Sequence, residues 1–190
     1  MQKTAHISDS EQHFLKIYEE NYKMVFSLVF NYLRSTEEAE EVTQDVFVKV
    51  YFSLDSFENR SSLKTWIFRI AVNASLEHLK KKKRKKRFGF IIPLFNEDTG
   101  IDNTRHLYVP GAQELMEKKE MEVALQEAID DLPPNQKTAF LLFKMDELSY
   151  KEVATIMDTS ESAVDSLLSR ARSNLKKYLE KKYPSRRKKE

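Results

Sequence analysis

The scarcity and placement of glycine and proline constrain this chain more than any other feature. Only three glycines and five prolines occur among 190 residues, and five of these eight lie between positions 89 and 111. Sandwiches and barrels need many tight turns, and such turns draw on these residues. The rest of the chain is rich in Glu, Lys, Leu, Ala and Val, which favour helix. We therefore predict an all-α protein of two small helical domains joined by a flexible linker over residues 88–113.

Several classes of function are excluded by what the sequence lacks. Without cysteine there is no disulfide, thiolate zinc site, iron–sulfur cluster or cysteine nucleophile. The four histidines are scattered and no glycine-rich phosphate loop occurs, so we expect no enzyme, metal, cofactor or small-molecule substrate. No apolar run approaches the ~20 residues that span a bilayer, and the polar N-terminus is no signal peptide. We expect a soluble cytoplasmic protein without a membrane partner.

Three helices are predicted for the first domain, residues 1–87. Apolar residues recur at helical spacing over 11–33, which predicts the first helix. The second begins at Ser35, where a hydroxyl accepts from exposed amides while Glu38 reaches back as in a capping box. Its apolar stripe leaves acidic and amide side chains on the other faces. The third begins near Ser62 and continues into an unbroken run of Lys and Arg over 80–87.

The second domain, residues 114–190, contains a helix-turn-helix pattern. One helix is predicted to end at Leu132, before two prolines, and another to carry Ala139, Phe140, Leu142 and Phe143. Ser149 and Glu152 then form a capping box that opens a short helix, and Ser160 caps a longer one after a three-residue break. The second member of such a pair can lie in a DNA major groove, although the pattern is more often plain packing.

The charge distribution favours a nucleic acid partner. The net charge is only +2, yet residues 80–87 contribute +8, and from Arg170 onward ten basic residues stand against two acidic ones. A single basic run is usually a solvated surface. Two runs that each end a helix favour phosphate binding instead. In the last helix, Arg170, Arg172, Lys176 and Lys177 are spaced to meet phosphates that flank a groove.

Aromatic and cationic residues alternate around the third helix. Phe57, Trp66 and Phe68 lie near Lys64 and Arg69 in the sequence, and Asn73 follows two turns after Trp66. Unpaired bases stack on aromatic rings at about 1 to 3 kcal/mol per base, while cations follow the backbone. This face is suited to melted DNA. Equally, Trp66 alone is suited to anchor a small core, because aromatic residues dominate burial.

Three segments together resemble the extracytoplasmic-function (ECF) group of bacterial RNA polymerase sigma factors, in the sigma-70 family. They are EAEEVTQDVFVKVY, SFENRSSLKTWIFRIAVNASLEHLKKKKR and LPPNQKTAFLLFKMDELSYKEVATIMDTSESAVDSLLSRARSNL. They occur in the family's order, and three motifs in register are far more specific than a helix-turn-helix alone. The resemblance implies a subunit without catalysis of its own that brings core RNA polymerase to promoter DNA and helps to open it. It also implies an anti-sigma factor that would cover the same surfaces.

The resemblance assigns a role to each segment. It implies polymerase docking for Glu41, Gln44, Asp45 and Lys49. It implies minus-ten DNA binding, with one base flipped into a pocket, for Phe57, Lys64, Trp66, Arg69, Asn73, Lys80, Lys81 and Arg84. It implies minus-thirty-five DNA binding for Ser162, Asp165, Ser166, Ser169, Arg170, Arg172 and Lys176. Many relatives carry basic residues at positions 165 and 167, so the promoter sequence that they prefer does not transfer to this chain.

Two other functions fit parts of the sequence. A helix-turn-helix regulator that acts without polymerase would use the second domain but leaves the whole first domain unexplained. Such regulators also tend to dimerise, whereas one sigma factor acts per polymerase. A nucleic-acid enzyme is the weakest alternative, because no acid pair, metal cluster or nucleophile is evident.

Overall fold

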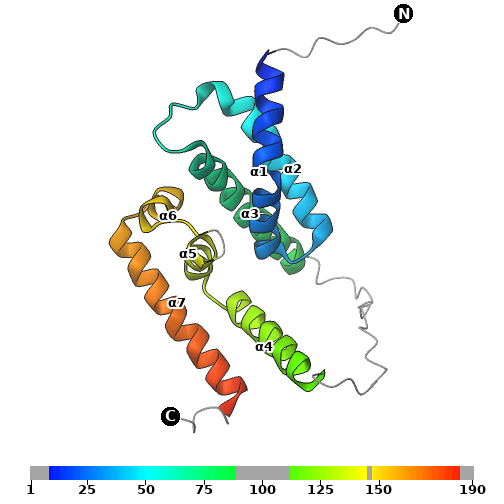
Figure 1. The fold of residues 1–190 in the computed structure, drawn as a ribbon, viewed down its shortest axis with the longest axis vertical. Helices are drawn as coiled ribbons and strands as arrows, with labels where there is room; N and C mark the ends of the chain where they lie inside the picture. Colours follow the sequence, from blue (N-terminus) through cyan, green and yellow to red (C-terminus); the bar gives the residue numbers. More distant parts are fainter. Residues whose placement is uncertain (1–8, 89–111, 145–146, 185–190) are drawn as a thin grey trace, which may run out of the picture.

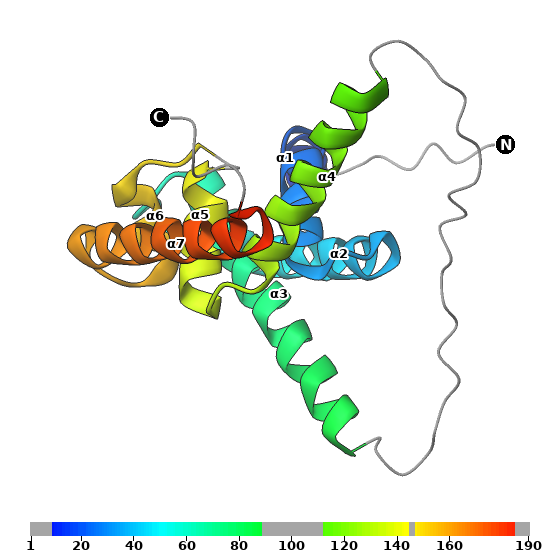
Figure 2. The ribbon, with the colours of Figure 1, turned by 90° about the horizontal axis from the view of Figure 1, so that it is seen from below.

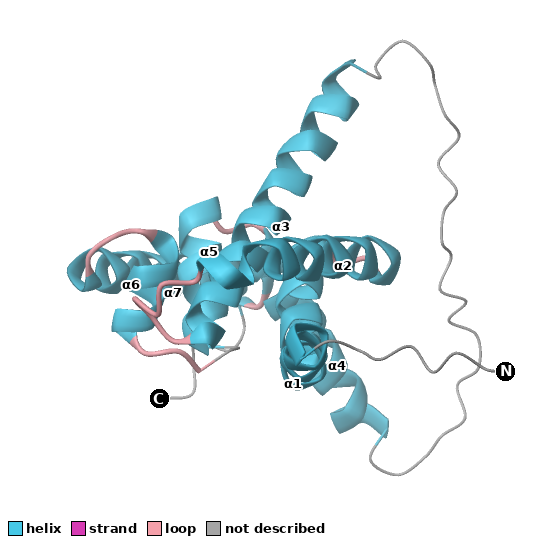
Figure 3. Ribbon diagram, turned by 90° about the horizontal axis from the view of Figure 1, so that it is seen from above, coloured by secondary structure: helices cyan, strands magenta, loops and turns pink. Residues whose placement is uncertain are grey.

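The computed structural model describes residues 9–88, 112–144 and 147–184, and within these ranges every regular element is a helix (Figure 1). Figure 3 shows the same arrangement coloured by secondary structure. The prediction of an all-α fold is confirmed. Of the predicted linker, residues 89–111 lie outside the described residues, and so do residues 185–190 at the basic C-terminus.

The first domain is formed by α1 (Asp9–Leu33), α2 (Thr36–Ser53) and α3 (Leu63–Phe88), with a 3₁₀ turn, η1 (Leu54–Ser56), after α2. The three α-helices pack on one another pairwise. Their contact is apolar because each helix turns its hydrophobic stripe inward, as shown by Leu28, Val46 and Ile67, which are fully buried. The helix boundaries agree with the sequence prediction to within a few residues, and η1 is an addition to it.

The start of α2 differs from the capping box that its sequence predicts. The Ser35 hydroxyl does accept a hydrogen bond from the Glu38 amide, at 3.3 Å. The Glu38 side chain, however, does not return to Ser35. It lies instead against Lys82, whose Nζ is 2.6 Å from Glu38 Oε1. A cation on the neighbouring helix therefore takes the place of the backbone amide, because an ion pair is a stronger partner for a carboxylate.

The second domain is formed by α4 (Ala112–Asp130), α5 (Pro134–Lys144), α6 (Tyr150–Met157) and α7 (Glu161–Lys182). The capping box of α6 is complete, since the Ser149 amide donates to Glu152 Oε2 at 2.9 Å and the Ser149 hydroxyl accepts from the Glu152 amide. Asp158 ends α6 in the left-handed conformation, and Ser160 caps α7. The helix-turn-helix is thus present with the predicted three-residue break.

The two domains pack against each other, which the sequence did not predict. Helix α6 lies on α3, and α5 lies on α1. Their buried apolar residues belong to one continuous cluster. Two ion pairs cross the boundary: Arg69 Nη2 lies 3.5 Å from Asp158 Oδ1, and Arg34 Nε lies 3.8 Å from Asp130 Oδ1. The basic end of α3, by contrast, projects beyond the other helices (Figure 2).

Candidate nucleic-acid interface and docking surface

Helix α7 presents one solvent-facing surface that contains all the predicted minus-thirty-five residues. Val164, Leu168, Ala171 and Leu175 are buried on its inner side. The predicted residues succeed one another at intervals of one to four and are all exposed: Ser162, Asp165, Ser166, Ser169, Arg170, Arg172 and Lys176. Because residues three and four apart are neighbours on a helix, most of this set forms a continuous strip.

The side chains along this strip differ in the hydrogen bonds and ion pairs that they form within the protein. The Ser166 hydroxyl donates to the Ser162 carbonyl at 3.0 Å, so it is partly engaged by the helix itself. Lys176 lies 4.0 Å from Glu180 in an exposed pair, which contributes little to stability. Arg170 and Arg172 form no ion pair with any residue that the structure describes. These two guanidinium groups are the ones best placed to receive phosphates.

The N-terminal half of α3 carries an aromatic pocket with cations beside it. The rings of Phe57 and Trp66 lie 5.0 Å apart between centroids, tilted by 35°. Both line a pocket together with Arg69 of α3 and Thr155 of α6. Lys64 and Asn73 are exposed on the same helix. Helical spacing places Arg69 and Asn73 on the same side of α3 as Trp66, whereas Lys64, two residues before Trp66, lies on another side of the helix.

Two aromatic residues of this region have different roles from those that the sequence alone could assign. Phe68 is fully buried in the core, so its predicted part in an aromatic surface for bases is wrong. Its ring instead supports Lys64, whose Nζ lies 5.6 Å from the ring centroid. Trp66 is half-buried: it packs against the core cluster and also lines the pocket. The packing interpretation of Trp66 therefore holds in part, and its role in binding bases stays a prediction.

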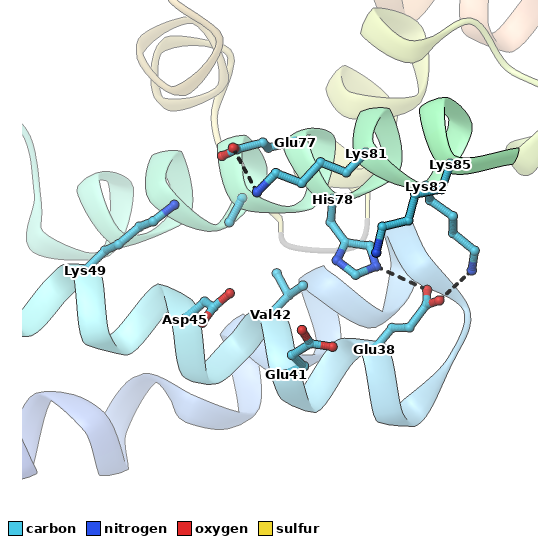
Figure 4. Close-up of a pocket in the computed structure, with 11 residues that line it drawn as sticks. Glu38, Glu41, Val42, Asp45, Lys49, Glu77, His78, Lys81, Lys82 and Lys85 are labelled. Carbon is cyan, nitrogen blue, oxygen red and sulfur yellow. Dashed lines mark hydrogen bonds and ion pairs between the residues drawn. The ribbon is translucent and has the colours of Figure 1, made fainter. Parts of the chain in front are cut away.

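The basic run continues α3 as one helix and is partly neutralised by acids. Lys80, Lys81 and Arg84 are exposed, as predicted. Lys81 pairs with Glu77 at 3.2 Å. Glu38 of α2 contacts Lys82 and also lies 3.6 Å from His78 Nε2 (Figure 4). The hydrogen bond from Lys82 is the main reason why the pKa of Glu38 lies below its usual range.

The four predicted docking residues are exposed on α2 but do not form a single face. Glu41, Asp45 and Lys49 border a groove between α2 and α3, opposite the lysines of the basic run (Figure 4). Gln44 borders a second, apolar groove between α1 and α2. The exposure of these side chains was predictable, because it follows from helical spacing. The sequence did not separate the two grooves, which depend on where α1 and α3 lie.

An exposed apolar patch beside Gln44 was missed by sequence reasoning. It consists of Val48, Tyr51 and Phe52, which border the same groove as Gln44, and Phe52 is 81% exposed. The signal was available: Val48 and Phe52 fall outside the buried stripe of Val42, Val46 and Val50, so helical spacing alone places them outward.

The described residues contain neither a metal-site cluster nor a membrane-spanning helix. In those ranges, no three His, Asp or Glu side chains gather as a metal site would require. The helices there include none that is long and apolar enough to cross a bilayer.

The comparison with known families assigns both domains. Residues 17–85 match Sigma-70 region 2, and residues 122–175 match Sigma-70, region 4. The three-helix domain and the helix-turn-helix domain are thus the two halves of a bacterial transcription initiation factor. The chain belongs to the sigma-70 family of RNA polymerase sigma factors.

Curated relatives place it within the ECF group. The chain is 32% identical to the ECF RNA polymerase sigma-E factor of Escherichia coli strain K12, over 78% of this chain and 76% of that protein. It is 29% identical to the ECF RNA polymerase sigma factor SigM of Bacillus subtilis, over 83% of this chain and 92% of the relative. As a sigma factor of this group, it binds core RNA polymerase and promoter DNA and directs promoter-specific initiation.

Solved structures support the fold. The sigma factor RpoE in complex with the anti-sigma factor NepR, from Bartonella quintana, matches with a TM-score of 0.63 and 23% identity. That match covers 89% of this chain and 98% of the other. CnrH in complex with the cytosolic domain of CnrY matches with a TM-score of 0.61 and 19% identity, over 90% and 89% of the two chains. The similarity extends over both helical domains.

Proposed function

We propose that the chain reads a promoter at two separated places, with a different chemistry at each. The first domain, residues 1–87, binds the melted minus-ten element through α3, and the second, residues 114–190, binds the minus-thirty-five duplex through α7. The observation that carries this division is the contrast between the two surfaces. Helix α3 has an aromatic pocket beside Arg69, whereas α7 has an exposed polar strip with cations.

At the minus-ten element, the pocket of Phe57 and Trp66 holds one flipped base. Flipping costs a few kcal/mol, which stacking on the aromatic walls offsets. The exposed amide of Asn73 has donors and an acceptor for a base edge. Lys64 and Arg69 follow the strand's phosphates, and Lys80, Lys81 and Arg84 hold the neighbouring duplex along the projecting end of α3.

At the minus-thirty-five element, the N-terminal part of α7 enters the major groove. Ser162, Asp165, Ser166 and Ser169 face the bases, and a carboxylate at position 165 accepts a hydrogen bond from the amino group of cytosine. Arg170, Arg172 and Lys176 fix the register by contacts to phosphates, which carry no sequence information themselves.

Polymerase docking uses α2, with Glu41, Gln44, Asp45 and Lys49 as its contacts. Their exposure on α2, a helix that carries none of the proposed DNA contacts, supports this role. The chain has no catalysis of its own and acts in the cytoplasm, where its polymerase is. An anti-sigma factor is a further proposed partner, because the two similar solved structures are sigma factors bound to such proteins.

The docking proposal is tested by charge reversal on α2. Asp45→Arg should weaken binding to core polymerase by about tenfold or more, because it sets a cation where an exposed carboxylate meets its partner. Glu40→Arg is the matched control, since Glu40 is exposed on the same helix outside the proposed contact set. Size-exclusion chromatography with core polymerase and titration by fluorescence anisotropy measure the effect. Normal affinity for the Asp45 variant, or equal loss in both variants, would refute the placement.

A further inference from the structure

Three residues that line the aromatic pocket each bond to one serine that lies behind it. Ser62 immediately precedes α3, and its hydroxyl accepts a hydrogen bond from the Thr65 amide at 3.1 Å. Its carbonyl accepts from the Trp66 amide at 3.0 Å and from the Ser61 hydroxyl at 3.3 Å. The pocket lining includes Ser61, Thr65 and Trp66, but Ser62 is not in it. Ser62 can therefore affect the pocket only through its neighbours.

A second bond joins Ser62 to Thr65 through their two side chains. The hydroxyl oxygens lie 2.7 Å apart, the usual distance of a hydrogen bond between hydroxyls. Thr65 is 3% exposed, so bulk water has little access to replace this bond. A buried hydroxyl that loses its partner destabilises the fold. The hydroxyl pair therefore favours one arrangement of the first turn of α3, with Thr65 and Trp66 at fixed places in it.

Phe57, the other aromatic residue of the pocket, is held from a different side. Its amide donates to the Leu54 carbonyl of η1 at 3.0 Å. Between Phe57 and Ser62 the chain forms a loop in which the exposed Asn59 has a positive φ of 55°. The contact between the rings of Phe57 and Trp66, at 5.0 Å between centroids, thus depends on two separate anchors, η1 and Ser62.

We propose that Ser62 and Thr65 are positioning residues for promoter opening, and that their hydroxyl pair sets Trp66 against Phe57 in the geometry that receives an unpaired base. The inference rests on the proposed function of the α3 pocket and adds to it two residues with no role assigned so far. A base gains stacking energy only from a ring that meets it in the right orientation and at contact distance. A pocket arranged in advance loses none of that energy to the ordering of its own side chains.

Ser62 also stabilises α3 as an N-cap, so its effect on stability has to be separated from positioning. An N-cap serine accepts from the amide three residues later, as Ser62 does, and its loss destabilises a helix whatever that helix binds. Ser35 provides the matched control. It caps α2 of the same domain in the same way, with its hydroxyl 3.3 Å from the Glu38 amide, and it is not part of the pocket lining.

Four variants of the full chain distinguish the hydroxyl pair from the cap. Thr65→Val keeps the branched shape of the side chain and removes its hydroxyl, while the amide of residue 65 can still bond to Ser62. Thr65→Ser keeps the hydroxyl and is the conservative variant. Ser62→Ala removes the cap and the pair together, and Ser35→Ala removes only the cap of α2. Circular dichroism and urea unfolding establish that each variant is folded and how much stability it loses.

Opening is measured with holoenzyme, on a promoter that the wild-type holoenzyme selects from a random DNA pool. Permanganate reactivity of unpaired thymines gives the rate of opening, and filter binding at a temperature too low for opening gives the affinity for duplex promoter. We expect Thr65→Val to slow opening by about two- to tenfold, the range of one hydrogen bond between neutral groups, with unchanged duplex affinity. Ser62→Ala should slow it at least as much. Thr65→Ser and Ser35→Ala should open at rates close to the wild type.

Trp66 reports its own placement, because it is the only tryptophan in the sequence. Its quenching by acrylamide is measured on the free protein. We expect quenching to increase in Thr65→Val and Ser62→Ala, since the ring loses one of its two anchors. Ser35→Ala should leave the quenching at the wild-type level.

Several results would overturn the positioning role. They are normal opening or unchanged quenching in Thr65→Val, equal slowing by Thr65→Ser, and a loss of duplex affinity as large as the loss in opening rate. Slow opening by Ser35→Ala, in proportion to its lost stability, would show that the cap acts through stability alone.

The pocket itself is tested apart from the hydroxyl pair by Trp66→Ala. If holoenzyme with this variant opens the promoter at the wild-type rate, the proposed function of the α3 pocket fails, whatever Thr65→Val does. Slow opening by Trp66→Ala together with normal opening by Thr65→Val would retain the pocket and reject the positioning pair.

Discussion

The two surfaces proposed to contact DNA differ in how accessible this structure leaves them. On α7 the polar strip lies on the solvent side, and the apolar side is covered by the rest of the second domain. On α3 the pocket of Phe57 and Trp66 opens toward α6. A helix that reads a groove must protrude, so the domain cannot cover it. A pocket that holds one base is concave, and a neighbouring helix can border it, as α6 does here through Thr155.

The largest expected change is a loss of stability when a core residue beneath the α7 strip is truncated. This substitution tests whether the two domains unfold together. Leu168 is 1% exposed beneath the α7 strip. Its replacement by alanine should lower the unfolding free energy of the second domain by about 2 to 5 kcal/mol, because it removes buried methyl groups and leaves a cavity. Urea unfolding followed by circular dichroism reports both domains, and Trp66 fluorescence reports the first.

If the two domains are weakly coupled, the unfolding free energy that Trp66 fluorescence reports should change by less than about 1 kcal/mol. The reason is that the ion pairs between the domains are largely exposed. Coincident shifts of both transitions would show that the continuous apolar cluster unfolds as one unit and that the two domains are not independently stable.

A second prediction separates the two surfaces by the form of DNA that they bind. Arg172→Ala should weaken duplex binding by holoenzyme and reduce the slope of log affinity against log salt by about one, because one phosphate contact is lost. Asn73→Ala should leave that slope unchanged and impair promoter melting, because its amide contacts unpaired bases only. Filter binding over a salt series and permanganate footprints measure the two effects. A wild-type footprint with the Asn73 variant would contradict its assignment.

The smallest effect is expected in the groove between α2 and α3, at an acid that is not among the proposed DNA contacts. The Lys82 hydrogen bond lowers the pKa of Glu38, so this pair stabilises the fold above the unfolded pKa of about 4.3, and the stabilisation disappears as the pH falls through the lower, folded value. Glu38→Gln should therefore cost under about 1 kcal/mol near neutral pH, since Lys82 is 43% exposed, and nothing in strong acid.

Urea unfolding of the wild type and of Glu38→Gln at several pH values measures this difference. Glu40→Gln serves as the control, because Glu40 is an exposed acid of the same helix for which no contact to Lys82 exists in the described structure. A loss in Glu38→Gln that persists at the lowest pH would indicate a role in packing rather than an ion pair.

Much of the fold was predictable because its signals are local. The spacing of apolar residues along α1 and α7, the complete capping box at Ser149 and the break at Asp158 each depend on residues within a few turns of one another. The exposure of the proposed α7 contacts follows from the same periodicity. Local patterns did not predict the partner of Glu38, because Lys82, which is distant in the sequence, competes with the Ser35 amide for its carboxylate. They also did not predict that the Phe68 ring is buried in the core.

By itself, then, the sequence determined the seven described helices, the helix-turn-helix and the family, since three motifs in order are a property of the chain alone. Only the tertiary structure decided that α6 lies on α3, that Asp158 meets Arg69 and that the docking residues border two grooves. The physical reason is that helical periodicity fixes which side of each helix is apolar, whereas contacts between distant helices depend on the shape and charge of both partners at once.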